Sequence, residues 1–165
     1  GSLSGHGLTE RMRMSIRYYV HPELRLRLAV YSGRLSRSDI ERFAEAMRTL
    51  TAEQFSYDAV LCFDDDINLS GISADDLLDL EDAMSEAAER AGGVGELRVA
   101  AVTESSSVVR ELKLWREIVQ PASAYRYRQE RFASLEAEVA WLGHPVEEAD
   151  KIRKREGFRP VPPAA

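Results

Sequence analysis

The feature that most constrains the fold is a short apolar run, Ala59-Val60-Leu61-Cys62-Phe63, enclosed between polar residues. A run of this length, bounded by turn-forming residues, is typical of a strand that is buried on both faces. An acidic turn containing Asp64, Asp65 and Asp66 follows the run, and a helical pattern begins at Ser73. Because α/β sheets carry their working residues after the carboxyl ends of strands, we expect a functional site between Asp64 and Ser73.

Two alternating segments precede this strand. Residues 16–20 and 24–31 alternate apolar and polar side chains, which is the period of a half-covered strand. The residues His21-Pro22-Glu23 between them predict a tight turn, because proline cannot donate a backbone hydrogen bond within a sheet. We therefore expect an antiparallel hairpin whose second strand carries Arg25 and Arg27 on one face.

The rest of the chain alternates between helical and strand-like patterns. Apolar residues at helical spacing predict a helix capped by Ser36 or Ser38, and three later helices that begin near Ser73, Thr103 and Ser134. Strands are predicted over residues 97–102 and, at a sheet edge, 124–127. The sequence thus predicts an α/β fold with a mixed sheet of about five strands, an opening hairpin, βαβ units and about four helices.

Length and composition favour one domain between two polar ends. A chain of 165 residues is long enough for a single core and too short for two ordinary domains. Residues 1–13 mix Gly, Ser and charge without a period and predict a flexible arm. Residues 14–143 form the predicted domain. Residues 144–165 are charged and then proline-rich, which predicts a tail with one helical turn around residues 147–155.

Charge and hydropathy restrict the function. A net charge of −6 disfavours binding to nucleic acid, since phosphate contacts depend on clustered Lys and Arg. No apolar segment approaches the roughly 20 residues that span a bilayer, so we expect no integral membrane association. The sequence shows no secretory leader, which favours a cytoplasmic location. The single cysteine, Cys62, has no internal partner and is interpreted as a small buried hydrophobe.

Several motifs together carry a family resemblance. Tyr57-Asp58-Ala59-Val60 leads into the central strand, the segment from Asn68 to Ser73 follows it, and the chain closes with Phe132-Ala133-Ser134-Leu135 and Trp141-Leu142. With the two opening strands, this order resembles the SpoIIAA-like branch of the STAS family, named for sulfate transporters and anti-sigma factor antagonists. The resemblance covers residues 14–143 and implies the SpoIIAA-like α/β fold.

The resemblance also implies a function that depends on binding another protein. Antagonists of this family bind a partner kinase and are switched by phosphorylation of a serine at a helix start, which corresponds here to Ser73. The family reads Asp-Ser-Ser or Asp-Ser-Thr before a glycine, whereas this chain reads Ser73-Ala74-Asp75-Asp76. Asp75 and Asp76 would repel a phosphate at this position. We therefore expect a non-catalytic regulatory or interaction module without a cofactor, with Ser70, Gly71 and Ser73 in its site.

A second surface is indicated by arginine and tyrosine residues near the predicted sheet edge. Arg25, Arg27, Tyr125 and Tyr127 are of the types enriched at protein interfaces. They predict contact with a protein partner or with a second copy of the chain, as a homodimer. The alternative is an ordinary solvated edge.

Two further hypotheses come from other functional classes. Helices that spread from the sheet would leave an apolar pocket, and the protein would then carry a small lipid-like ligand. The residues expected to line this pocket are Phe43, Met47, Leu80 and Trp115. A phosphotransfer or metal enzyme would instead need Asp64, Asp65 and Asp66 to converge with the residues from Ser105 to Ser107. Three aspartates in one turn are usually solvated, so the sequence predicts no metal site.

Overall fold

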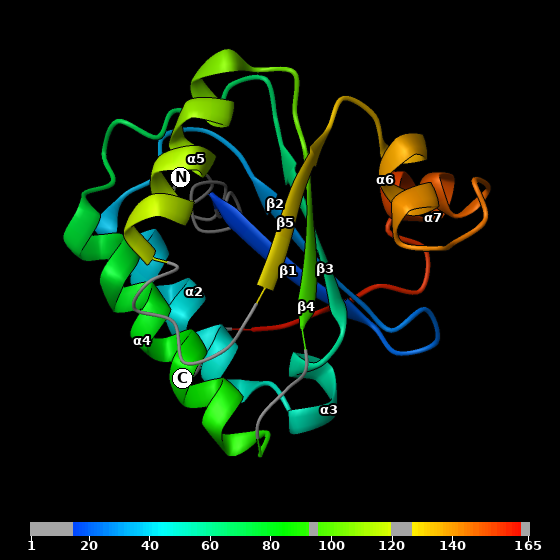
Figure 1. Ribbon diagram of the computed structural model, residues 1–165, viewed down its shortest axis with the longest axis horizontal. Coiled ribbons are helices and arrows are strands. Elements are labelled where there is room, and N and C mark those ends of the chain that lie inside the picture. The colour runs from blue at the N-terminus through cyan, green and yellow to red at the C-terminus, as the bar shows by residue number, and fades with distance from the viewer. Residues whose placement is uncertain (1–14, 93–95, 120–126, 163–165) are drawn as a thin grey trace, which may run out of the picture.

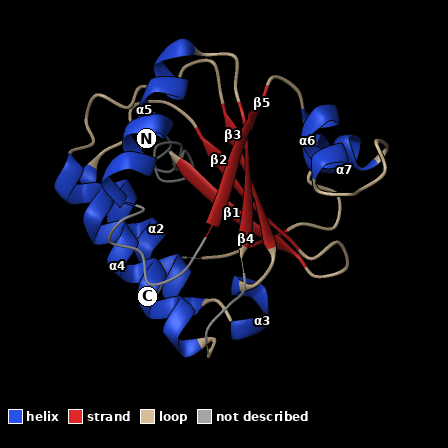
Figure 2. Cartoon of the chain, in the orientation of Figure 1, coloured by secondary structure: helices blue, strands red, loops and turns tan. Residues whose placement is uncertain are grey.

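The computed structural model describes residues 15–92, 96–119 and 127–162. They form a six-stranded sheet with helices on both of its faces (Figures 1 and 2). The strands are β1 (Ile16–His21), β2 (Leu26–Tyr31), β3 (Asp58–Phe63), β4 (Leu97–Val102), β5 (Tyr127–Phe132) and β6 (Arg159–Pro160). The helices are α2 (Arg37–Thr49), α3 (Ala52–Phe55), α4 (Ala74–Arg90), α5 (Ser106–Val119), α6 (Leu135–Trp141) and α7 (Glu148–Lys154).

The sheet is mixed, and its strand order is β5-β4-β3-β2-β1-β6. β1 runs antiparallel to β2 and to β6, while β2, β3, β4 and β5 run parallel to one another. The predicted mixed α/β architecture and its opening hairpin are therefore confirmed. The elements outnumber the prediction because α3 and β6 are short and lack the periodicity that marks longer segments, and because α7 was expected only as one helical turn of the tail.

The helices divide unequally between the two faces. α2, α4 and α5 lie side by side on one face, and α6 and α7 lie on the other (Figure 1). Each of the first three joins neighbouring parallel strands in the same direction across the sheet. Because such crossovers share one hand, successive helices are placed on the same face. The chain passes to the other face only after β5.

β2 is covered on both faces. All six of its residues are buried. Leu28 and Val30 pack in the cluster beneath α6 and α7, whereas Ala29 and Tyr31 pack against the opposite helix layer. Arg27 shares the face of Tyr31, because alternate residues of a strand point the same way. The alternation predicted that the second hairpin strand would be half-covered. This prediction was wrong, because helices cover both faces of the sheet at β2.

The segment that follows α6 belongs to the folded core. Ile152 of α7 is fully buried, and Ala149 and Phe158 pack with it against the α6 side of the sheet. The chain then adds β6, whose Pro160 pairs with Tyr19 of β1. Residues 144–162 are thus packed helix and strand, whereas the sequence predicted a tail with one helical turn around residues 147–155. The predicted arm at residues 1–13 lies outside the described residues.

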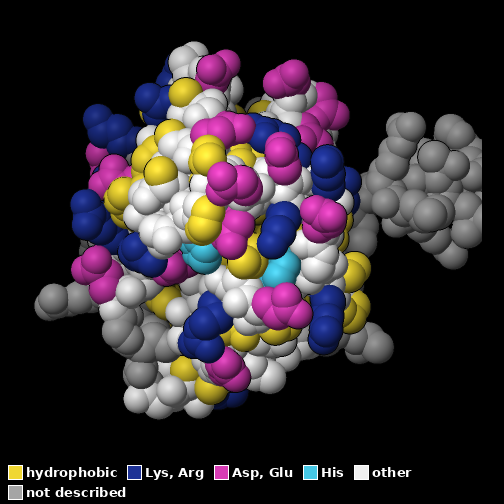
Figure 3. Space-filling model, turned by 90° about the vertical axis from the view of Figure 1, so that its right-hand side faces the viewer, with side chains coloured by type: hydrophobic (Ala, Val, Ile, Leu, Met, Phe, Trp, Pro, Cys, Tyr) yellow, Lys and Arg dark blue, Asp and Glu magenta, His cyan; other side chains and the backbone are white. Residues whose placement is uncertain are grey.

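The surface over α6 and α7 has mixed charge. Figure 3 shows basic and acidic side chains interspersed on this face, with hydrophobic side chains emerging between them. Such a face creates no strong field of one sign. None of the helices in the described part of the chain is both long and apolar enough to cross a lipid bilayer.

Candidate functional site

A cavity of about 50 Å³ lies between the sheet and the layer formed by α2, α4 and α5. Most of its wall is apolar, but charged and phenolic side chains also reach it. The side chains on the sheet side are Tyr18, Arg27, Tyr31, Ala59, Leu61, Leu97, Val99, Tyr127 and Gln129. Those on the helix side are Phe43, Met47, Glu81, Met84 and Trp115.

Strand register builds the floor of the cavity. Arg27 pairs with Ala59, Ala59 with Val99, and Val99 with Gln129, so these four residues form one row across β2, β3, β4 and β5. All four line the cavity. The small side chain of Ala59 leaves space in the middle of the row. The cavity therefore has a cationic end at β2 and an amide at β5.

Helical spacing builds the roof. Phe43 and Met47 lie four residues apart on α2 and point to the same side of that helix. A second cavity, of about 40 Å³, shares Tyr31, Phe43 and Trp115 with the first and is also lined by Leu80. The four residues predicted to line a pocket do border these two cavities. That a ligand occupies them stays a proposal.

Arg27 is the buried cation of the site. Its side chain is only 3% exposed. The guanidinium Nε donates to the carbonyl oxygen of Tyr57 at 3.2 Å, and Nη1 donates to the hydroxyl of Tyr18 at 3.1 Å. The guanidinium carbon also lies 5.1 Å from the centroid of the Phe55 ring. Burial raises the pKa values of the Tyr18 and Tyr31 phenols, so both hydroxyls stay protonated near neutral pH.

Glu81 of α4 is the buried carboxylate of the site. It is 1% exposed, and its Oε1 accepts a hydrogen bond from the hydroxyl of Ser85 at 3.2 Å. Burial, followed by the charge of Glu81, raises the pKa of Tyr127 to about 12. Glu81 and Tyr127 are therefore close, at the β5 side of the cavity.

The residues predicted to form an interface are divided between surface and interior. Arg25 is exposed, pairs with Glu53 at 2.9 Å and lies over the Tyr57 ring. Arg27 is buried, and Tyr127 is half-buried at the cavity. Arg27 is thus not part of the surface that the sequence predicted, because the helices cover its face of the sheet. Tyr125 lies outside the described residues.

Two of the three aspartates after β3, Asp64 and Asp66, have different partners. Asp64 lies 3.4 Å from Arg17, whereas the carboxylate of Asp66 accepts a hydrogen bond from the Gly33 N–H at 3.0 Å. Asp65 is exposed. Within the part of the chain that the structure describes, no group of three or more His, Cys, Asp or Glu residues is arranged to hold a metal ion.

An open groove of about 410 Å³ does bring two of these aspartates towards the start of α5. It is lined by Asp64 and Asp65 together with Thr103, Glu104 and Ser105. Asp64, Asp65 and Ser105, which a phosphotransfer or metal enzyme would need to bring together, thus line one groove. Asp66 is directed elsewhere by its bond to Gly33.

Gly71 is placed by a close approach between two loops. A Cβ atom at this position would lie 2.4 Å from the carbonyl oxygen of Leu35. The same two loops are joined by a backbone hydrogen bond from Leu35 N–H to the Asn68 carbonyl at 3.0 Å. The neighbouring Ser70 is exposed, and its N–H donates to the Asn68 side chain. The role of Gly71 in this geometry is packing.

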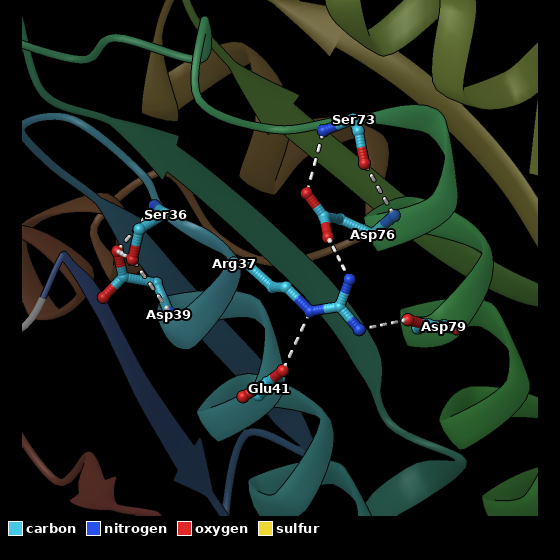
Figure 4. A network of polar contacts seen from close by, with 7 residues as sticks. All are labelled: Ser36, Arg37, Asp39, Glu41, Ser73, Asp76 and Asp79. Atoms are coloured by element: carbon cyan, nitrogen blue, oxygen red, sulfur yellow. Dashed lines mark hydrogen bonds and ion pairs between the residues drawn. The ribbon is translucent and has the colours of Figure 1, made fainter.

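Ser73 caps α4 in a reciprocal arrangement with Asp76 (Figure 4). The Ser73 hydroxyl accepts from the Asp76 N–H at 3.2 Å, and the Asp76 carboxylate accepts from the Ser73 N–H at 2.9 Å. Arg37 extends the network, with Nη1 lying 3.7 Å from Asp76 and Nη2 lying 3.4 Å from Asp79. The predicted cap is present, and α2 is capped in the same way by Ser36 with Asp39.

Sequence reasoning missed Glu81 and Glu138 as special residues. Both are almost fully buried. The signal was present, since Glu81 lies four residues after Leu77 and three before Met84, and Glu138 lies four residues before Leu142. A carboxylate within the apolar stripe of a helix indicates a buried acid.

Comparison of the chain with protein-family models, with curated proteins and with solved structures gives no match. The interpretation of the site therefore depends on its own geometry.

Proposed function

We propose that this chain is a cytoplasmic, non-catalytic binding protein that holds a small, largely apolar molecule in the cavity beneath α2, α4 and α5. The observation that carries the proposal is the buried guanidinium of Arg27 on the wall of an apolar cavity, where its hydrogen bonds go to the Tyr57 carbonyl and the Tyr18 hydroxyl. Placing a charge in a protein interior costs several kcal/mol unless it is well compensated. An apolar wall with a few convergent polar groups is also the usual composition of a ligand site.

The protonation of the tyrosines supports binding over acid-base catalysis. An efficient general acid or base has a pKa near the working pH. Burial instead raises the pKa values of Tyr18, Tyr31 and Tyr127 above the ordinary phenol value. These hydroxyls would serve as fixed hydrogen-bonding groups for a ligand.

Methyl NMR of the methionines tests the proposal. The chain has four methionines, and Met47 and Met84 line the cavity. Protein labelled with ¹³C at the methionine methyl groups is titrated with short neutral amides and alcohols. We expect shifts of the Met47 and Met84 signals that saturate with concentration.

A variant that fills the floor provides the matched control. Ala59→Leu adds volume at the centre of the cavity, so the saturable shifts should disappear, whereas Ala140→Leu on the exposed side of α6 should leave them unchanged. Circular dichroism checks that both variants are folded. Wild-type protein whose Met47 and Met84 signals do not move with any of these ligands would exclude the proposal.

The regulatory or protein-interaction module is a second candidate. The groove beside Asp64 and Asp65 favours it, because this groove is open and lies at the carboxyl ends of parallel strands, where α/β proteins bind ligands. Intact-mass analysis of protein from its source cells, with peptide mapping, would detect a phosphate on Ser73. Ser73 without phosphate under every growth condition would count against the phosphoswitch.

A further inference from the structure

We propose that the ligand of this cavity is a monocarboxylate with a short apolar chain, whose carboxylate binds Arg27. This inference rests on the proposed function and specifies the chemical class of the ligand. The chain of the ligand would lie between the sheet and the side chains of Phe43, Met47 and Trp115, all of which border the cavity.

The hydrogen bonding of Arg27 leaves donors for such a ligand. A guanidinium has five N–H donors, and the structure gives neutral partners to two of the nitrogens of Arg27, the Tyr57 carbonyl and the Tyr18 hydroxyl. Among the described residues, no Asp or Glu oxygen lies within ion-pair distance of this guanidinium. Arg27 is thus a buried cation on a cavity wall, and none of the described residues forms an ion pair with it.

A ligand carboxylate would supply the missing charge. Arginine binds carboxylates through two parallel N–H bonds, and such pairs are strong where water is excluded. The protonated hydroxyls of Tyr18 and Tyr31 line the same end of the cavity and would add donors to the carboxylate. This end therefore has the features of a carboxylate site.

The other end of the cavity limits the charge of the ligand. Gln129 lies three strands from Arg27 in the same row, a separation of roughly 14 Å at the usual strand spacing. Glu81 approaches Tyr127 on that side, so its carboxylate would repel a second negative charge. A phosphate dianion or a dicarboxylate is therefore disfavoured relative to a monocarboxylate.

The size of the cavity limits the length of the ligand. An apolar cavity of roughly 150 Å³ holds benzene. The cavity here, of about 50 Å³, is smaller, so only a short chain fits it. A neighbouring apolar cavity of about 40 Å³ borders the same side chains of Tyr31, Phe43 and Trp115, and the distal end of the chain would enter it by displacing these side chains.

The test compares two ligands of nearly the same shape, butyrate and butyramide, with inorganic phosphate as a third probe. Affinities are read from the Met47 and Met84 methyl signals. We expect butyrate to bind wild-type protein at least about tenfold more tightly than butyramide, because a charged hydrogen bond is lost in the amide. Phosphate should bind more weakly than butyrate.

The variant Arg27→Met should remove this preference and retain the binding of butyramide. Arg25→Met, which changes an exposed arginine two residues away, should leave the preference intact. Because Arg27→Met removes buried hydrogen bonds and could prevent folding, a second measurement uses wild-type protein alone. Butyrate labelled with ¹³C at its carboxyl group should titrate, when bound, at a pH lower than that of free butyrate.

The outcomes separate the two proposals. Equal affinities for butyrate and butyramide, or a bound carboxyl whose pKa is not lowered, would overturn the assignment of a carboxylate and leave a binding protein for neutral ligands. A failure of all probes to shift Met47 and Met84 would overturn both. Tighter binding of phosphate than of butyrate at the same signals would exclude the monocarboxylate and indicate a phosphate site.

Discussion

Glu138 of α6 is fully buried against the sheet, and neither of its carboxylate oxygens has a hydrogen-bond partner among the described residues. Burial raises its pKa to about 8. Cys62 on β3 lies nearby, and its thiol pKa is raised to about 12, mainly by burial and then by the charge of Glu138. Near neutral pH, the side chain of Glu138 is therefore mostly protonated and uncharged.

This environment predicts a pH dependence of stability. The folded pKa of about 8 exceeds the ordinary value of 4.5, so the folded state holds an extra proton between these values. Glu138 therefore reduces the free energy of unfolding as the pH rises from about 4.5 to 8, by up to about 1.4 kcal/mol per pH unit. Urea unfolding at pH 5, 7 and 9 should show this loss, and Glu138→Gln should reduce it.

The exposed Glu156 provides the matched control for that series. Glu156→Gln should change the stability little and leave the pH dependence as in the wild type. If Glu138→Gln loses stability between pH 5 and pH 9 as steeply as the wild type, another group titrates and the assignment to Glu138 is wrong.

Gly71 provides a prediction about packing. Gly71→Ala places a methyl group against the backbone oxygen of Leu35, and a backbone atom cannot move aside cheaply. We expect a loss of about 1–3 kcal/mol in the free energy of unfolding. Ser70→Ala changes an exposed side chain next to it and should cost far less. Equal costs for the two variants would contradict the close approach of the loops.

The helix α7 illustrates how a short element contributes to the core. Ile152 is fully buried in the cluster beneath α6 and α7. Ile152→Ala should therefore lower the free energy of unfolding by about 2–5 kcal/mol, because it removes buried apolar contacts and leaves a cavity. Lys154→Ala on the exposed side of the same helix is the control. A cost at Ile152 no larger than at Lys154 would show that α7 is not packed in solution.

Helix boundaries were largely predictable, because their signals are local. Ser73 and Ser134 cap α4 and α6 as expected from their sequence neighbours. For α2 two serines were candidates, and Ser36 is the cap because its partner is Asp39. The pattern that favoured Ser38, with Glu41 three residues later, was also a valid local signal. Which serine caps α2 depended on the residue at which the helix begins, and the helix begins at Arg37.

The sheet as a whole predicts a gradient of local stability. β2 is hydrogen-bonded to a strand on each side and is buried on both faces, whereas β5 lies at the edge of the sheet and is partly exposed. Amide hydrogen exchange should therefore be slowest in β2 and its neighbour β3, and faster in β5. Mass spectrometry of peptic fragments would measure this order. Slower exchange in β5 than in β2 would contradict the topology.

The candidate site was only partly predictable, since its parts come from distant segments. Apolar periodicity identified Phe43, Met47, Leu80 and Trp115 as inward-facing residues. It could not show that cavities remain between them, because volume depends on how the side chains of several elements fit together. Arg27 illustrates the same limit, since its alternation with apolar residues is equally typical of a solvated strand face.

Local sequence was sufficient for the caps at Ser73 and Ser134 and for the mixed α/β order, because these depend on residues within a few positions of one another, whereas β5 (Tyr127–Phe132) lies later than the strand predicted at residues 124–127. Long-range packing decided the rest. Arg27 is a buried cation because α2, α4 and α5 cover its face of the sheet. Glu138 and Ile152 are buried because α6 and α7 pack on the opposite face. Burial is a property of neighbours that are distant in sequence, and burial gives these residues their chemistry.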